Sequence, residues 1–301
     1  MWSIHVKTAV DSRGEVITPH HMDQMQGREG QIVTINGNFN PNVLIEYGGL
    51  LRLRIVNAFT SRFYRLTLEN HPLYLIATDA VFLYKTVEKQ ELLLTPGERV
   101  EVLIKGEIKP GQYRLFNLPY YRGEMGMMGG GMGIMWGIRN NNSRSVQVLA
   151  TLNYSVKTKP IPLTQSLITV EKLPPPQTTL RFTLNHSMTP EMGIIFLING
   201  NYFNPNRIDT KVKLNSVEDW EITNTGVMDH PFHLHTNPFQ VINRNGIAEA
   251  YPSWKDTVLV KAGEVVRIPI HFKDFIGKSV YHCHILDHED LGMMGVLEIV
   301  A

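Results

Sequence analysis

Half of the twelve histidines and the only cysteine lie in two short segments near the carboxyl end of the chain. Residues 230–235 carry a histidine at their first, fourth and sixth positions. Residues 282–294 begin with a cysteine between two histidines and add a further histidine. Imidazole and thiolate groups are ligands for copper, zinc and iron. This concentration of donors predicts a transition-metal site rather than a set of isolated structural histidines.

A β-strand would divide these donors into two groups, because successive side chains of a strand face opposite sides. Cys283 would face one side, and its neighbours His282 and His284 would face the other. We therefore expect two metal environments, back to back on one strand. The donors on the cysteine side are His230, Cys283, His288 and Met293, and those on the other side are His233, His235, His282 and His284.

The cysteine side offers one thiolate, two imidazoles and one thioether, the ligand set typical of a blue-copper electron-transfer centre. The four imidazoles of the other side suit copper, zinc or iron. A structural zinc site usually contains several cysteines, and here there is one. A zinc-hydrolase pattern is nearly matched, but Asp287 comes one residue too late. A cysteine protease would need a separate oxyanion element, and none is evident.

The pattern H-P-x-H-x-H followed by H-C-H-x3-H-x4-M resembles the two carboxyl-terminal copper motifs of the multicopper oxidases, the family that includes the laccases. The whole chain is similar to the second and third cupredoxin domains of a three-domain bacterial laccase, with the amino-terminal domain absent. The resemblance implies copper as the cofactor. It implies a type 1 copper held by His230, Cys283, His288 and Met293 (with Met294 as second choice), a type 2 copper at His233, and a type 3 pair at His235, His282 and His284.

The resemblance also implies an activity. Single electrons from phenols, aromatic amines or metal ions would enter at the type 1 copper, and a trinuclear copper site would reduce dioxygen to water. Cys283 would carry the electrons, because its backbone is continuous with His282 and His284. Glu289 would be the proton donor, unless it belongs to a solvated acidic loop. Asp229 and Trp254 are candidates for a reductant pocket.

The oxygen site of the family needs further histidines from two H-x-H motifs, and residues 1–150 contain no such motif. Three explanations are open: the chain is a fragment, a second chain supplies the missing half-site, or two copies pool their histidines. The alternative function is a non-catalytic blue-copper electron-transfer or copper-binding protein. A trimeric protein similar to nitrite reductase is disfavoured by the H-C-H pairing.

Four sequence echoes, offset by roughly 160 residues, indicate two copies of one domain. The echoes pair residues 35–42 with 198–206, 71–76 with 230–235 and 96–102 with 262–268, and repeat one glycine spacing. Alternating segments rich in β-branched residues predict strands at 51–56, 99–104, 179–184 and 265–270. We expect an all-β protein of two tandem cupredoxin-like Greek-key β-sandwiches or barrels: 1–155 without copper ligands, a linker at 156–177, and 178–301 with the copper ligands.

The first copy is expected to bind no copper. The echo aligns His71 with His230, and puts Tyr74 and Ile76 where His233 and His235 stand. The glycine spacing puts Asn117 where Cys283 stands. His71 is therefore expected to be structural.

A glycine-rich loop follows in the first copy and holds five of the thirteen methionines. Thioethers are soft ligands that select Cu(I). The loop is either a cuprous-ion or substrate-associated segment or an irregular excursion in which methionine fills gaps. Its methionines are Met125, Met127, Met128, Met132 and Met135.

Composition and net charge limit the kinds of partner that the chain is expected to bind. The chain has 301 residues and a net charge of +1, so we expect no nucleic-acid partner. No apolar run reaches the ~18–20 residues of a membrane span. The expected partners are a small-molecule reductant and dioxygen. The first residues lack a signal-peptide pattern, and only the family resemblance suggests a periplasmic or secreted location.

Overall fold

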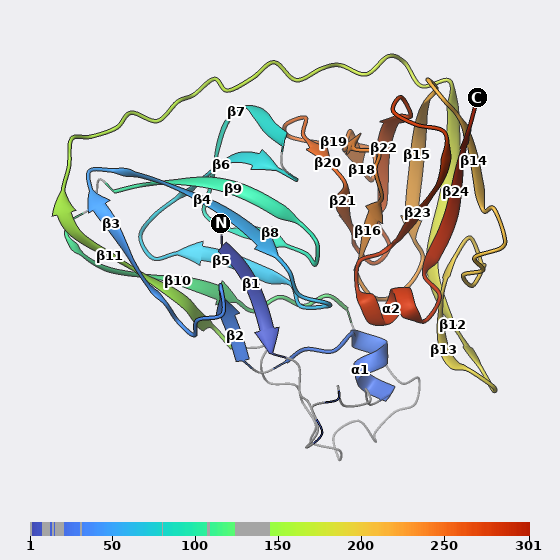
Figure 1. Ribbon diagram of the computed structural model, residues 1–301, viewed down its shortest axis with the longest axis horizontal. Coiled ribbons are helices and arrows are strands. Elements are labelled where there is room, and N and C mark those ends of the chain that lie inside the picture. The colour runs from blue at the N-terminus through green and yellow to red at the C-terminus, as the bar shows by residue number, and fades with distance from the viewer. Residues whose placement is uncertain are drawn as a thin grey trace.

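The protein consists of two β-rich halves joined by a long extended segment (Figure 1). The computed structural model describes residues 2–7, 13, 15, 21–30, 32–79, 81–106, 109–123 and 145–301. The helices among these residues are α1 (His21–Gln26) and α2 (Leu286–Asp290). They come from opposite ends of the chain and contact each other below the two halves.

The strands of the first half form two sheets. Their bounds are β1 Trp2–Lys7, β2 Ile32–Ile35, β3 Asn42–Tyr47, β4 Leu50–Asn57, β5 Tyr64–Leu68, β6 Leu73–Thr78, β7 Val81–Lys89, β8 Leu92–Leu94, β9 Arg99–Lys105, β10 Gly111–Leu118 and β11 Gln147–Lys157. One sheet has the order β2-β1-β4-β9-β6-β7 and the other β3-β11-β10-β5-β8. Buried side chains from both sheets, such as Leu53 and Leu66, form one core.

The second half repeats this plan. Its strands are β12 Thr178–Thr189, β13 Gly193–Ile198, β14 Thr210–Lys213, β15 Val217–Asn224, β16 His230–Leu234, β17 Phe239–Gln240, β18 Asn243–Arg244, β19 Ile247–Ala248, β20 Trp254–Lys255, β21 Thr257–Val260, β22 Val265–His271, β23 Gly277–Cys283 and β24 Met294–Val300. One sheet has the order β13-β12-β15-β22-β17-β20, with β18 and β19 beside it, and the other β14-β24-β23-β16-β21. The four segments predicted as strands lie in β4, β9, β12 and β22.

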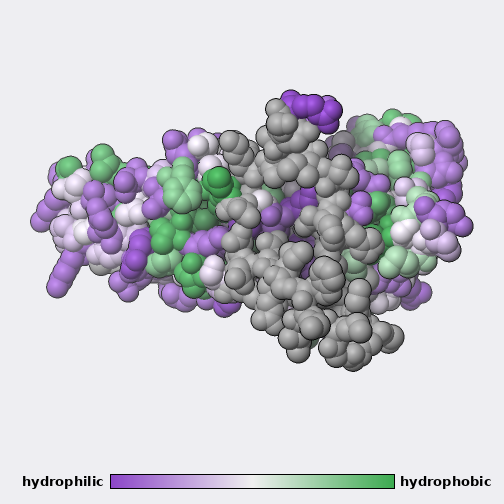
Figure 2. All heavy atoms as spheres, turned by 90° about the horizontal axis from the view of Figure 1, so that it is seen from below, coloured by the Kyte–Doolittle hydropathy of each residue, from purple (hydrophilic) through white to green (hydrophobic). Residues whose placement is uncertain are grey.

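The surface does not gather its apolar side chains into one region on the face that Figure 2 shows. Polar and apolar residues are interspersed over the described part of that face. Exposed apolar side chains belong to separate elements, among them Leu44 on β3, Met188 on β12 and Ile247 on β19. Within the described residues, neither helix has the length or hydropathy needed to cross a bilayer.

Two Asn-Gly turns confirm the internal repeat. Asn36 and Asn199 both have positive φ, 50° and 53°, and each is followed by a glycine with positive φ. This combination suits the tight turn between two antiparallel strands. The Oδ1 atom of Asn36 accepts a hydrogen bond from the Ser3 N–H, and that of Asn199 accepts one from the Thr183 N–H. The two halves therefore start their sheets with the same local structure.

A buried asparagine also recurs in each half. The amide of Asn57 donates to the carbonyls of Arg62 and Leu94, and the amide of Asn224 donates to those of Met228 and Val260. Each asparagine thus ties the end of a strand to two backbone segments of the opposite sheet. In the second half, one of these segments leads directly into β16.

This shared geometry corrects one predicted alignment. Tyr64 pairs with Leu94 as His230 pairs with Val260, so Tyr64 is the structural counterpart of His230. His71 is not, because the strand that follows it, β6, pairs with β7 and β9 in the other sheet. The expected matches of Tyr74 with His233 and of Ile76 with His235 are wrong for the same reason. The alignment rested on a chance His-Pro pair and took no account of the order of the strands, so it matched the wrong strands.

The other correspondence in the first half is confirmed. Asn117 pairs with Leu66 on β5 as Cys283 pairs with Phe232 on β16. The first half therefore has an amide side chain at the position where the second half has its cysteine. His71 has a structural role: its Nδ1 lies 2.7 Å from the Glu69 carbonyl and its Nε2 lies 2.9 Å from the Tyr154 hydroxyl. Both ring nitrogens are occupied by these contacts.

We predict that Asn224→Ala lowers the free energy of unfolding by about 2–6 kcal/mol, because two buried carbonyls lose their donor at about 1–3 kcal/mol each. Urea unfolding of the metal-free chain measures this. Asn201→Ala is the matched control, since Asn201 is exposed and donates one long hydrogen bond of 3.3 Å. A loss as large in the control as in Asn224→Ala would contradict the role given to the buried amide.

Candidate metal centre

The pairing of β16 with β23 arranges the metal-binding motifs. Phe232 lies opposite Cys283, and His233 lies opposite His282. Side chains at paired positions share a face of the sheet. Cys283 therefore faces the buried core with Phe232, while His233 and His282 face the other side. Two separate groups of donor atoms result, one on each face.

The first group consists of His230, Cys283 and His288. The Cys283 Sγ atom lies 3.5 Å from Nδ1 of His230 and 3.8 Å from Nδ1 of His288, and the two Nδ1 atoms are 3.2 Å apart. Ligands about 2.0–2.3 Å from one metal ion at tetrahedral angles are about 3.3–3.7 Å from each other. The triangle thus has the size of a metal site, and all three side chains are buried.

Residues of the first half fix the orientation of His288. Its Nε2 atom donates to the Met25 carbonyl at 3.0 Å, which leaves Nδ1 free to bind a metal. The ring stacks on Phe196, with centroids 3.9 Å apart. Arg28 holds α2 in place, because its backbone N–H and its Nε both donate to the carboxylate of Asp287. A hydrogen bond to the second ring nitrogen of a metal-binding histidine sets its tautomer.

Met293 and Met294 face opposite sides. Met294 lies opposite His282 in the pairing of β23 with β24, so its side chain belongs to the face of the histidine group. Met293 is fully buried in the core that contains Cys283, and its carbonyl accepts the Cys283 N–H. The alternation thus favours Met293 over Met294 as a fourth donor.

The protonation states of the first group suit a metal. Burial lowers the pKa of His230 to about 3, and it lowers the pKa of His288 well below its ordinary value, so both rings are neutral ligands. Burial raises the pKa of the Cys283 thiol to about 12, so a metal must displace its proton. The Ile285 N–H points at Sγ, 3.5 Å away, and favours the thiolate.

The second group consists of His233, His235 and His282. Their ring centroids are 4.7 to 5.3 Å apart. The Nδ1 atom of His282 donates to the Cys283 carbonyl at 2.9 Å, so its Nε2 is free, and it faces Nε2 of His235 at 3.0 Å. Burial lowers the pKa of His282 to about 3. The two Nε2 atoms are close enough to bind one metal ion together once it displaces the proton that they share.

His284 lies beside this group. Its ring centroid is 5.4 Å from that of His233 and 5.7 Å from that of His282. Gly97 of the first half packs on its ring, since a Cβ there would lie 2.3 Å from the Nε2 atom of His284. Gly97 also has a φ of 80°, which disfavours any side chain. A glycine is therefore needed for the ring to keep this place.

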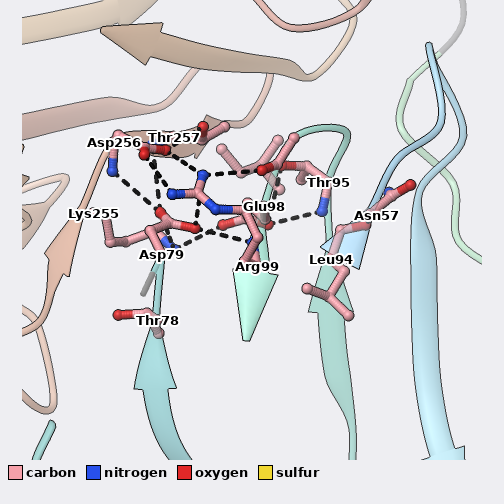
Figure 3. A network of polar contacts seen from close by, with 12 residues as sticks. Asn57, Thr78, Asp79, Leu94, Thr95, Glu98, Arg99, Lys255, Asp256 and Thr257 are labelled. Atoms are coloured by element: carbon pink, nitrogen blue, oxygen red, sulfur yellow. Dashed lines mark hydrogen bonds and ion pairs between the residues drawn. The ribbon is translucent and has the colours of Figure 1, made fainter. Parts of the chain in front are cut away.

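A network of charged side chains joins the two halves, with Glu98 and Arg99 from one half and Lys255 and Asp256 from the other (Figure 3). This network contacts His233 and orients its ring. The Nδ1 atom of His233 lies 2.8 Å from the carbonyl of Asp256 and 3.0 Å from the Thr257 hydroxyl. The Asp256 carboxylate accepts two hydrogen bonds from Arg99 of the first half, at 2.7 and 2.5 Å. Burial would raise the pKa of Asp256, but the hydrogen bonds from His233 and Arg99 hold it well below its ordinary value.

A buried lysine extends the same network. Lys255 lies 2.9 Å from Glu98 and 3.5 Å from Asp79, both in the first half. Burial would lower the pKa of Lys255, but these two carboxylates raise it above the ordinary lysine value. Buried charges are tolerated only when they are paired. The pairing fixes the backbone of Asp256, and through it His233.

The other candidate residues are the proposed proton donor, the two residues of the reductant pocket and the methionines of the glycine-rich loop. Burial raises the pKa of Glu289. Besides burial, the negative charge of Glu289 raises the pKa of the Cys283 thiol, which places this carboxylate near the first group. Near the second group, burial lowers the pKa of His235 and His284, and the carboxylate whose charge opposes this lowering is that of Asp256. Asp229 precedes His230, and its carboxylate accepts hydrogen bonds from the Tyr120 hydroxyl and the Ala262 N–H. Trp254 pairs with Gln240 on β17. Met125, Met127, Met128, Met132 and Met135 lie outside the described residues.

Several residues that shape the site could not be inferred from the motifs. Met25, Arg28, Gly97 and Arg99 all belong to the first half and reach the site across the contact between the halves. They stand in no spacing relation to the histidines. The Gly-Glu pair at residues 97–98, which recurs at 263–264, was a signal in the sequence, since it marks the turn that carries Gly97.

Comparisons with known proteins agree with this geometry. Family models described as multicopper oxidase match residues 10–135 and 173–300. The chain belongs to the multicopper oxidase family. Copper is thus the cofactor to which the His and Cys groups correspond.

Individual relatives support the same assignment. The multicopper oxidase mco of Staphylococcus haemolyticus is 30% identical over 282 residues, which are 91% of this chain and 53% of that protein. A laccase of Bacillus stratosphericus is 28% identical, with 90% of this chain and 55% of that protein covered. The chain spans about half the length of these curated relatives.

A solved structure gives the fold. A multicopper oxidase from Campylobacter jejuni, described as a metallo-oxidase, superposes on the whole chain with a TM-score of 0.85 and 31% sequence identity. The match covers 63% of that chain. The two halves are therefore cupredoxin-like domains, as the sequence predicts.

We predict that the metal-free chain loses stability on acidification below about pH 6.5. In the unfolded chain the buried histidines titrate near ~6.5, whereas in the folded chain they stay neutral to much lower pH. Between these values the unfolded chain binds more protons, so the free energy of unfolding falls as pH falls, by about 1.4 kcal/mol per pH unit for each histidine. The histidines concerned are His230, His282, His284 and His288.

Urea unfolding of the metal-free chain at several pH values measures this slope. The His284→Gln variant is the matched control, because it removes one of the titrating groups and is expected to flatten the slope. A free energy of unfolding that does not change between about pH 6.5 and 4.5 would show that these rings are not held neutral.

Proposed function

We propose that the chain is part of a laccase-like multicopper oxidase, as a fragment or a subunit. In this function, single electrons from phenols, aromatic amines or low-valent metal ions enter at His230, Cys283, His288 and Met293. They leave toward a second group, which takes part in the reduction of dioxygen to water. One observation carries the proposal: the two donor groups lie on opposite faces of one strand and share the backbone of Cys283.

The donor atoms fit copper better than zinc. The first group has one sulfur, two neutral imidazoles and a buried thioether nearby, a set typical of electron-transfer copper. Bound copper would supply one-electron redox chemistry. The chain excludes water around Cys283, holds the His288 ring through the Met25 carbonyl, and offers a covalent path of a few bonds from Cys283 to His282 and His284.

The second group is incomplete as an oxygen site. His233, His235 and His284 are only partly buried, and the described residues bring no further histidine to them. We propose that a domain or chain with two H-x-H motifs covers this face and supplies the other ligands. The coverage of about half of each relative is consistent with that proposal. Glu289 is proposed as proton donor, and a periplasmic or secreted location is proposed from the family alone.

A second function is favoured by the contrast between the two groups. The Cys283 group is buried and has its donors within this chain, whereas the histidine group is open. A non-catalytic electron-transfer or copper-binding protein would need the Cys283 group alone. Copper content per chain and oxygen uptake distinguish the two: filling of both groups with uptake supports the oxidase, and filling of the first group without uptake supports the carrier.

We predict that Cys283→Ser abolishes the intense blue absorption of the copper-loaded chain, because that band requires the bond from sulfur to copper. Visible absorption at matched copper content measures it. Met294→Leu is the control, since Met294 faces the other side of β24 and its loss should leave the band intact. A Cys283→Ser variant that stays blue would contradict the ligand set.

We further predict that Met293→Leu keeps the colour and raises the reduction potential, because the axial ligand tunes the potential of such sites. A spectroelectrochemical titration of the copper-loaded chain measures the shift. An unchanged potential in Met293→Leu, with a changed one in Met294→Leu, would transfer the axial role to Met294.

A further inference from the structure

Two buried arginines next to the Cys283 group share one carboxylate. The Glu29 carboxylate lies 3.3 Å from the guanidinium of Arg122 and 3.5 Å from that of Arg62, and all three side chains are nearly inaccessible. The second Glu29 oxygen, Oε2, and Nε of Arg62 have no hydrogen-bond partner among the described residues. Two guanidinium groups and one carboxylate give these three side chains a net charge of +1, and a net charge is costly in a buried place.

The contacts of Arg122 place that charge beside the metal-binding residues. Its guanidinium donates to the carbonyl of Gln26, the residue after Met25, and to the carbonyl of Ser61 at 2.7 Å. Its own carbonyl accepts the N–H of Asp229, the residue before His230. Arg122 thus contacts the residue next to Met25, whose carbonyl orients His288, and the residue next to His230.

The charge of Arg122 acts on all three ligands of the group. Besides burial, which dominates each shift, Arg122 lowers the pKa of the Cys283 thiol and of the His230 and His288 rings. Burial in turn lowers the pKa of Arg122. Arg62 differs, because its guanidinium donates to the carbonyl of Gly30 and to the side chain of Gln147. Both arginines pair with Glu29, but the other contacts of Arg62 are to residues that do not adjoin the Cys283 group.

We propose that Arg122 is a charged positioning residue that raises the reduction potential of copper bound at Cys283, and that Glu29 opposes it. The proposal rests on the proposed copper-binding role of the Cys283 group. The oxidised site carries one more positive charge than the reduced site. A fixed cation in a low-dielectric interior therefore disfavours the oxidised state, and a fixed anion favours it.

The test is the reduction potential of the copper-loaded chain, measured by redox titration of its blue band, for Arg122→Met and Glu29→Gln. Both substitutes keep side-chain length. Arg122→Met is expected to shift the equilibrium toward the oxidised state by on the order of tenfold, and Glu29→Gln is expected to shift it the opposite way. Arg122→Lys, which restores the charge, should recover most of the loss. Arg62→Met is the matched control and should shift the equilibrium less than Arg122→Met.

Opposite signs for Arg122→Met and Glu29→Gln support the proposal, because damage to packing would not depend on the sign of the removed charge. Shifts of the same sign, no shift, or an equal shift in Arg62→Met overturn it. If Arg122→Met does not fold, Glu29→Gln still tests the sign, because it must shift the equilibrium toward the reduced state, while Arg122→Lys, which keeps the charge, should stay near the unaltered chain. Failure of the proposed function is distinguishable, since it would leave the unaltered chain itself without a blue band.

Discussion

The antiparallel pairing of β16 with β23 is the constraint on which the rest of the site depends. It sets Phe232 opposite Cys283 and His233 opposite His282. Because successive side chains of a strand face opposite sides, the cysteine and the histidines then lie on different faces. A shift of one residue in this register would turn the cysteine toward the histidine face and mix the two groups. On the other side of β16, the amide of Asn224 ties the end of β15 to the segment before β16 and to β21.

The second constraint is the contact between the halves. One half contains the histidines and the cysteine, but the other supplies the Met25 carbonyl to His288, the bare backbone of Gly97 to His284, and Arg99 to Asp256. The contacts of Met25 and Arg99 are hydrogen bonds, and Gly97 contributes close packing. Beside them, the buried Lys255 is paired with Glu98 and Asp79, and such buried charges are costly to separate. The first domain therefore determines how the candidate metal donors of the second are oriented.

The sequence predicted which donor side chains the structure brings together, because they lie in contiguous motifs where strand alternation alone separates Cys283 from its neighbours. It predicted the register of the first domain only in part. Asn117 was matched correctly to Cys283 by a glycine spacing within one strand, whereas His71 was matched to His230 by a chance dipeptide. The contact of Met25 with His288 spans 263 residues and depends on tertiary packing, so no local pattern could reveal it.

The central claim is that the sulfur of Cys283 binds copper together with Nδ1 of His230 and His288. X-ray absorption spectroscopy at the copper edge of the loaded chain tests it most directly. We expect a short bond from copper to one sulfur, with two imidazole nitrogens in the same shell. A first shell of nitrogen and oxygen alone, with the metal in the histidine group and the thiol still protonated, would contradict it.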